Sequence, residues 1–124
     1  MMYLQKAEDS LKTSQILFDK GLYDDMASRA YYAAYRLVCV ALHNTGQLDI
    51  ENVRKYNHKW VRINFSRFLK EKNLLQIKGN LEFLLEYRMT ADYEPKTSLS
   101  REDAEEVLGK LTEFFQTIKD YLNT

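Results

Sequence analysis

Apolar residues recur at every third or fourth position along most of the chain, which is the period of an amphipathic α-helix. This pattern predicts helices over about residues 3–20, 24–45, 58–70 and 74–93, and a last helix that follows Ser100 and reaches about Leu122. The inward positions of the second helix are mostly small, which lets a neighbouring helix approach closely: Ala27, Ala30, Ala34, Leu37 and Ala41. Residues 47–57 lack a clear helical period and are expected to form a connection, with a single turn of helix at most.

Residues typical of helix ends lie between these segments. Gly21 and the run Asn44-Thr45-Gly46 are placed to end the first two helices. Pro95 ends the fourth, because it disfavours helical backbone in the residue before it. Ser100 and Asp103 resemble a capping box. Short connections favour antiparallel neighbours, so we predict an all-α fold: an antiparallel up-and-down bundle of four to five helices in a single domain, residues 1–124.

Length and composition are consistent with one small intracellular domain. A chain of 124 residues is long enough to bury a core without disulfides, and its single cysteine, Cys39, rules out an internal one. Charged residues come too early for a signal-peptide core, and no apolar run is long enough to cross a bilayer. We therefore expect a cytoplasmic protein that makes no contact with membranes.

The charge of the chain is balanced overall but uneven locally. Lys plus Arg and Asp plus Glu each total 18, so the chain has no general attraction for polyanions. Basic side chains nevertheless gather between Arg54 and Lys72, interleaved with aromatic residues and with His58. This segment is compatible with an RNA contact. It is also compatible with the commoner arrangement, a solvated basic face whose aromatic rings point into the core.

The sequence offers few of the residue types that bind metal ions and none of the known loops that bind phosphate. His43, His58 and Cys39 are the nitrogen and sulfur ligands, and their spacing matches no known zinc motif. The sequence contains neither a glycine-rich phosphate loop nor a nucleophile elbow. We expect no metal and no cofactor, so any chemistry must come from arginine, histidine, tyrosine and carboxylate side chains.

Arg88 is the most informative single residue. It continues the apolar stripe of the fourth predicted helix, where a charge must be paired, bound to a ligand or placed at an interface. Asp92, one turn later, offers an ion pair, and the sequence leaves this structural role and a functional one open. Tyr93 lies about 140° further round a regular helix, so we expect it to meet Arg88 only if the helix end unwinds.

The second predicted helix carries a further set of candidates on the face opposite its alanines: Arg29, Tyr32, Arg36 and His43, with Cys39 among them. Guanidinium, phenol and imidazole groups together can hold a phosphate and stack a base, as in proteins that bind single-stranded nucleic acids. The same residue types also dominate protein interfaces. An RNA- or nucleotide-binding site and a protein-binding face both remain open for this helix.

Four segments resemble, in order, those of small prokaryotic HEPN-domain proteins: Lys6-Ala-Glu-Asp-Ser-Leu11, Gly21-Leu-Tyr-Asp-Asp-Met-Ala-Ser-Arg-Ala-Tyr-Tyr-Ala33, Arg88-Met-Thr-Ala-Asp-Tyr93 and Ser100-Arg-Glu-Asp-Ala-Glu-Glu106. The resemblance covers nearly the whole chain. It implies a four- or five-helix bundle, frequently a homodimer, often encoded beside a minimal nucleotidyltransferase in a toxin–antitoxin pair. Active members are metal-independent RNases in which an Arg stabilises charge on the phosphate and a His four to six residues later assists proton transfer.

This sequence departs from the active family pattern at one position. Arg88 is the counterpart of the catalytic Arg, but Tyr93, preceded by Asp92, fills the place of the His. A phenol with an ordinary pKa near 10 is a poor base at neutral pH. Related pairs carry a nucleotidylated Tyr two residues beyond the His, and that position here is Pro95.

Three hypotheses follow. The leading one is a non-catalytic or weakly catalytic RNA- or nucleotide-binding module that works with a nucleotidyltransferase and uses Arg88 at a dimer interface. The second is a metal-independent endoribonuclease toxin in which Arg88 is essential and His58 or Tyr93 assists. The third is a protein–protein interaction module that uses the second predicted helix.

Overall fold

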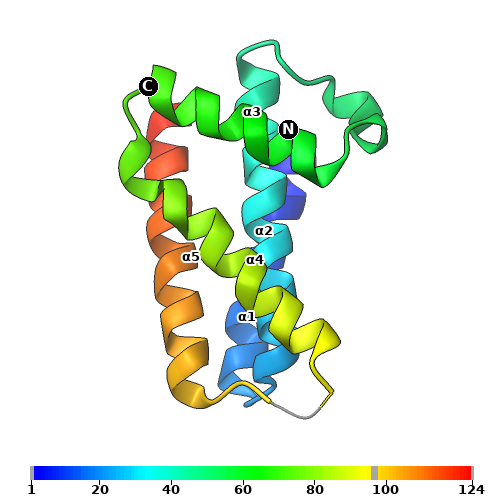
Figure 1. Ribbon diagram of the computed structural model, residues 1–124, viewed down its shortest axis with the longest axis vertical. Helices are drawn as coiled ribbons and strands as arrows, with labels where there is room; N and C mark the ends of the chain where they lie inside the picture. The colour runs from blue at the N-terminus through cyan, green and yellow to red at the C-terminus, as the bar shows by residue number, and fades with distance from the viewer. Residues whose placement is uncertain (1, 96–97, 124) are drawn as a thin grey trace.

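The computed structural model describes residues 2–95 and 98–123, so residues 1, 96, 97 and 124 of the predicted domain lie outside the described part. The predicted all-α fold is confirmed, and this part of the chain contains no strand (Figure 1). The helices are α1 (Met2–Asp19), α2 (Tyr23–Asn44), η1 (Ile50–Lys55), α3 (His58–Glu71), η2 (Leu75–Ile77), α4 (Lys78–Tyr93) and α5 (Arg101–Leu122).

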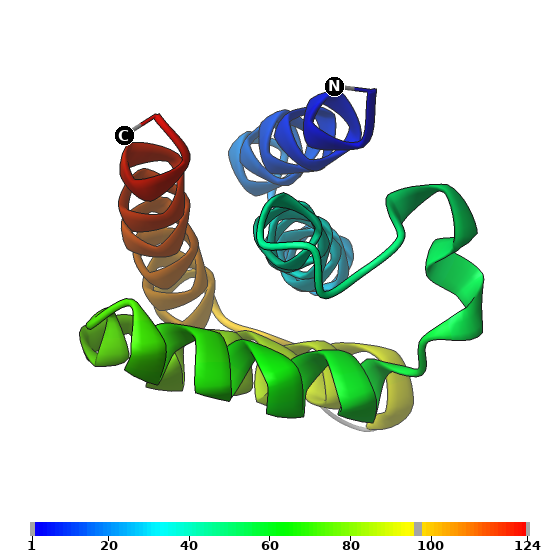
Figure 2. The ribbon, with the colours of Figure 1, turned by 90° about the horizontal axis from the view of Figure 1, so that it is seen from above.

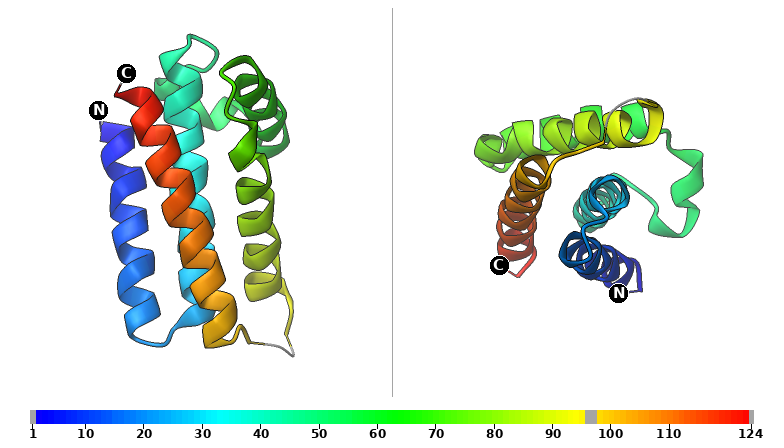
Figure 3. Two further views of the ribbon diagram at one scale, coloured as in Figure 1. Left: turned by 90° about the vertical axis from the view of Figure 1, so that its left-hand side faces the viewer. Right: turned by 90° about the horizontal axis from the view of Figure 1, so that it is seen from below.

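The four long helices α1, α2, α4 and α5 run alternately down and up the molecule, as Figure 3 shows. The helix α3 crosses the bundle near one end and packs against α2 (Figure 1). The 3₁₀ helix η1 loops out to one side of α1 and α2, as seen from above in Figure 2. None of the helices in the described ranges is long and apolar enough to span a membrane.

Helix α2 lies at the centre, in contact with α1, α3, α4 and α5. Its alanine stripe is fully buried, as predicted. Side chains outside this stripe are buried as well, among them Tyr31, Tyr35 and Cys39. The helix is therefore enclosed on nearly all sides, which a two-sided sequence pattern did not indicate.

Helix ends agree with the sequence signals to within a few residues. The capping box at the start of α5 is present: the Ser100 side chain accepts from the Asp103 amide, and the Asp103 side chain accepts from the Ser100 amide. The predicted fourth helix begins instead as the short 3₁₀ turn η2, and α4 starts at Lys78. The 47–57 connection contains η1, which Asp49 caps by accepting from the Glu51 amide.

The aromatic residues of the basic segment point inward. Phe65 and Phe68 are buried and stack at 5.7 Å between ring centroids, while Tyr56 and Trp60 are half-buried. Most of the lysine and arginine side chains around them are exposed. The segment has the arrangement expected of a solvated face over a core.

Candidate functional site

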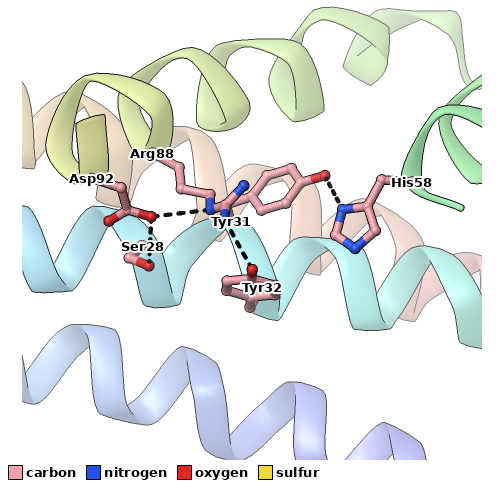
Figure 4. Close-up of polar contacts among 6 residues, drawn as sticks. All are labelled: Ser28, Tyr31, Tyr32, His58, Arg88 and Asp92. Carbon is pink, nitrogen blue, oxygen red and sulfur yellow. Dashed lines mark hydrogen bonds and ion pairs between the residues drawn. The ribbon is translucent and has the colours of Figure 1, made fainter. Parts of the chain in front are cut away.

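Arg88 projects from α4 onto α2 and is largely buried, with 16% of its side chain exposed. Its Nη2 donates a hydrogen bond to the Tyr32 hydroxyl at 3.0 Å, and its Nε lies 3.2 Å from Oδ2 of Asp92 (Figure 4). The ion pair with Asp92 that the sequence suggested is therefore formed. Within the described residues the Nε atom has no hydrogen-bond partner, so its approach to Asp92 has an unfavourable angle and is held by charge attraction.

Tyrosine rings surround the Arg88 guanidinium. Its Cζ lies 5.0 Å from the ring centroid of Tyr32, 5.5 Å from that of Tyr31 and 6.0 Å from that of Tyr93. Cation–π attraction at such distances stabilises the charge while leaving it able to bind an anion. The expectation that Tyr93 approaches only if the helix unwinds is wrong: α4 stays helical to Tyr93, and the Arg88 side chain extends along the last turn towards Asp92.

Asp92 also links α4 to α2. Its Oδ2 accepts a long hydrogen bond of 3.5 Å from the hydroxyl of Ser28, and 30% of its side chain is exposed. One carboxylate oxygen therefore serves both Arg88 and Ser28. The guanidinium is therefore held by one shared carboxylate and by the Tyr32 hydroxyl.

His58, the first residue of α3, joins the same group through Tyr31. Its Nδ1 lies 3.2 Å from the Tyr31 hydroxyl, and its ring stacks on Tyr35 at 3.9 Å. Burial, followed by the positive charges of Arg62 and Arg88, lowers the pKa of His58 below its ordinary value of 6.5. The imidazole is therefore neutral at pH 7. We refer to the residues drawn in Figure 4 as the Arg88 cluster: Ser28, Tyr31, Tyr32, His58, Arg88 and Asp92.

The structure thus gathers Arg88, Asp92, His58 and Tyr32 from the residues proposed on sequence, with Tyr93 at the margin. Ser28 and Tyr31 were not singled out as site residues. Both belong to the Ser28-Arg-Ala-Tyr-Tyr-Ala33 segment. The specificity of that segment was the signal that could have identified them.

The other candidates on α2 do not reach the cluster. Arg29 is exposed and lines a shallow groove beside Ser28 and Tyr32. Arg36 instead faces α1, where its Nη1 donates to the Ser10 hydroxyl at 2.6 Å. His43 bonds through Nδ1 with the carbonyl of Leu48 at 3.0 Å and fastens the turn after α2. Arg36 and His43 therefore serve two separate contacts, one with α1 and one with the turn after α2.

The cluster has the components of a phosphate site and of limited acid–base chemistry. A fixed guanidinium can neutralise a phosphate, and a neutral imidazole can accept a proton. Within residues 2–95 and 98–123 no three His, Cys, Asp or Glu side chains gather in a way that could hold a metal ion.

Comparison with known proteins agrees with the resemblance seen in the sequence. The HEPN domain family model matches residues 1–121. A Methanocaldococcus jannaschii protein named "Putative toxin MJ0142" is 30% identical over 122 residues, an alignment that covers 96% of this chain and 78% of that protein. With a family match over almost its whole length and a relative aligned over most of both chains, this chain belongs to the HEPN domain family.

Proposed function

We propose that this HEPN protein is the toxin-like member of a toxin–antitoxin pair with a nucleotidyltransferase, and that its Arg88 cluster binds a phosphate of RNA or of a nucleotide with little or no cleavage. The observation that carries the proposal is the Arg88 guanidinium, held on the rings of Tyr31 and Tyr32 and neutralised by one shared carboxylate. The name of the M. jannaschii relative supports a toxin-like role.

Binding is favoured over efficient cleavage by the positions of the potential bases. Tyr93, which fills the place of the family's catalytic His, is 65% exposed and carries a phenol. His58 is neutral, but one of its ring nitrogens is occupied by Tyr31. Efficient proton transfer requires a base that is free and directed at the reacting group.

A homodimer is part of the proposal. Two large apolar side chains near Arg88 on α4 are exposed, Met89 at 47% and Tyr93 at 65%. A second copy that covered them would remove apolar surface from water and place two Arg88 clusters at one interface. The pairing with a nucleotidyltransferase rests on the family resemblance, and in this role the protein acts in the cytoplasm.

RNA binding tests the proposal directly. Fluorescence anisotropy with a labelled single-stranded RNA would compare the wild type with Arg88→Ala. We expect a higher Kd for the variant, and a slope of log affinity against log salt that is shallower by about 0.7 for each phosphate no longer neutralised. Arg101→Ala is the matched control, because it removes an exposed ion pair of the same i,i+4 type, with Glu105, at the start of α5. Equal affinities for Arg88→Ala and the wild type would contradict the proposal.

A metal-independent endoribonuclease is the second candidate, favoured by the Tyr31 bridge that brings a neutral His58 to the Arg88 cluster. Incubating labelled RNA with the wild type, Arg88→Ala and His58→Ala in EDTA separates the two functions. The binding role predicts intact RNA in every sample. Cleavage by the wild type that disappears in both variants would establish the nuclease and assign His58 as its base.

A further inference from the structure

A cavity lies beside the Arg88 cluster, and Arg88 is not among the residues that line it. It is open to solvent on one side, has a volume of about 510 Å³ and is lined by residues of α1, α2, η1 and the start of α3. This size falls within the range of small-molecule binding sites. Tyr32 and His58, two members of the Arg88 cluster drawn in Figure 4, also line this cavity. We call it the tyrosine pocket, after Tyr3, Tyr32, Tyr35 and Tyr56 in its walls.

The charge of the tyrosine pocket is positive and unneutralised. Lys6, Arg36 and Arg54 line it, and none of its lining side chains is a carboxylate. Among the residues that the structure describes, none of these three cations takes part in an ion pair. Three converging cations without an acidic partner form a site for an anion, with phosphate the strongest biological candidate.

One of these cations is fixed in place. Arg36 donates to the Ser10 hydroxyl at 2.6 Å, and Ser10 is itself buried. The hydrogen bond uses Nη1 and leaves other guanidinium donors for a ligand. Lys6 and Arg54 are exposed, so they can close on a bound anion from α1 and η1.

The aromatic walls are also held rigid. The Tyr35 ring stacks on His58 with an interplanar angle of 18°, and the Tyr56 ring packs against Trp60 at 4.7 Å. The Tyr56 hydroxyl accepts from the Asp49 amide at 3.0 Å, which fixes the ring relative to η1. Rigid aromatic surfaces are the usual partners of unpaired bases, because every base can stack on them.

From these observations we propose that the tyrosine pocket binds one unpaired nucleotide, with its base against the tyrosine rings and its phosphate on Lys6, Arg36 and Arg54. The ligand chemistry is a base joined to a phosphate, whether as a free nucleoside monophosphate or as one residue of single-stranded RNA. None of the three cations belongs to the Arg88 cluster, and the two sites share Tyr32 and His58.

Isothermal titration calorimetry with the full chain tests this site, using AMP, GMP, CMP and UMP, with adenosine and inorganic phosphate as partial ligands. We expect the nucleotides to bind more tightly than either part alone. The double variant Lys6→Ala/Arg54→Ala should raise Kd about tenfold or more, because it removes charge-assisted hydrogen bonds. The control Lys12→Ala/Arg67→Ala also removes one Lys and one Arg, both outside the pocket, and should leave Kd unchanged.

The aromatic wall is tested separately. Tyr56→Ala should raise Kd about tenfold because the base no longer stacks on the ring, whereas Tyr56→Phe keeps the ring and should bind like the wild type. Arg88→Ala is compared with the double variant: because the three cations of the pocket stay in place, it should raise the Kd of AMP less than Lys6→Ala/Arg54→Ala does. This result keeps the tyrosine pocket distinct from the function proposed for Arg88.

Competition identifies the source of the nucleotide. Displacement of AMP by a short single-stranded RNA at lower concentration than by free nucleotides supports an RNA residue as the occupant, and tight AMP binding that RNA does not displace supports a free nucleotide. Binding of phosphate as tight as that of AMP overturns the proposal. So does the absence of nucleotide binding, or binding that Arg88→Ala abolishes and Lys6→Ala/Arg54→Ala leaves intact.

Discussion

The Tyr31 hydroxyl lies 3.2 Å from Nδ1 of His58 and joins the buried centre of α2 to the first residue of α3. Burial raises the pKa of Tyr31, so its phenol keeps its proton at neutral pH. The phenol and the neutral imidazole share this hydrogen bond, and the ring nitrogen of His58 that carries the proton sets which of them donates. Through this hydrogen bond the Arg88 cluster receives an imidazole that lies 30 residues away in the sequence from Arg88.

The first prediction concerns pH. Because the pKa of His58 is lower in the folded protein than its ordinary value of 6.5, the unfolded chain takes up a proton at a higher pH than the folded one. The free energy of unfolding of the wild type should therefore decrease as the pH is lowered from about 8 to about 5.5. Carboxylates are still largely ionised at the lower pH. Urea unfolding at these two pH values, compared with His58→Gln, measures the effect.

The change in unfolding free energy between the two pH values should be smaller in His58→Gln than in the wild type. All other titrating groups are common to both proteins and largely cancel in the comparison. Equal changes with pH in the two proteins would show that His58 keeps its ordinary pKa.

A second prediction concerns the packing of α4 against α5. Asn80 is buried, and its Nδ2 donates both to the carbonyl of Lys110 at 3.1 Å and to Oε1 of Glu113 at 2.8 Å. Asn80→Ala removes both hydrogen bonds and should lower the free energy of unfolding by about 1–3 kcal/mol. Urea denaturation is the measurement, and Gln76→Ala, at an exposed position shortly before α4, should change stability little.

The capping box gives a third prediction. Ser100→Ala removes the hydroxyl that accepts a hydrogen bond of 3.1 Å from the Asp103 amide at the start of the amphipathic helix α5. Removing an N-cap costs about 1 kcal/mol, so the thermal midpoint should fall by several degrees. Ser98→Ala, at an exposed position two residues earlier, serves as the control. A midpoint that falls equally in both variants would assign the effect to the loop and not to the cap.

Much of this fold could be predicted because its local signals agree. The capping residues, the Pro95 stop and the apolar stripe of α5 each point to the same helix ends as the structure. The 3₁₀ start of α4 could not be predicted, since η2 occupies residues with an unbroken helical apolar pattern. Ile77, the last residue of η2, is buried.

Less of the candidate functional site than of the fold could be predicted from the sequence. The Arg88–Asp92 pair was found because both residues lie on one helix, one turn apart. The approach of Arg88 to Tyr31, Tyr32 and, through Tyr31, His58 depends on the packing of α2 against α3 and α4. No periodicity within a single helix contains that information. For the same reason the sequence did not predict that Arg36, on the stripe of α2 that carries Tyr32, contacts α1 through Ser10.

The last prediction separates a structural from a functional role of the ion pair at Arg88. If the pair serves only stability, Asp92→Asn should destabilise the protein and leave RNA binding unchanged. In the function we propose, Asp92 competes with a phosphate for the guanidinium, because its Oδ2 lies 3.2 Å from Nε. Removing its charge should therefore tighten RNA binding severalfold at low salt, and the gain should shrink as salt screens the attraction.

Anisotropy titrations of labelled RNA at two salt concentrations, with the wild type, Asp92→Asn and Asp120→Asn, decide between these roles. Asp120 lies near the end of α5, is exposed and, like Asp92, accepts a hydrogen bond from a neighbouring side chain, so its substitution removes the same charge at a distant site. Tighter binding in Asp92→Asn alone would place the RNA phosphate at Arg88. The same gain in both variants would reflect net charge only, and weaker binding in Asp92→Asn would mean that the carboxylate positions the guanidinium for its ligand.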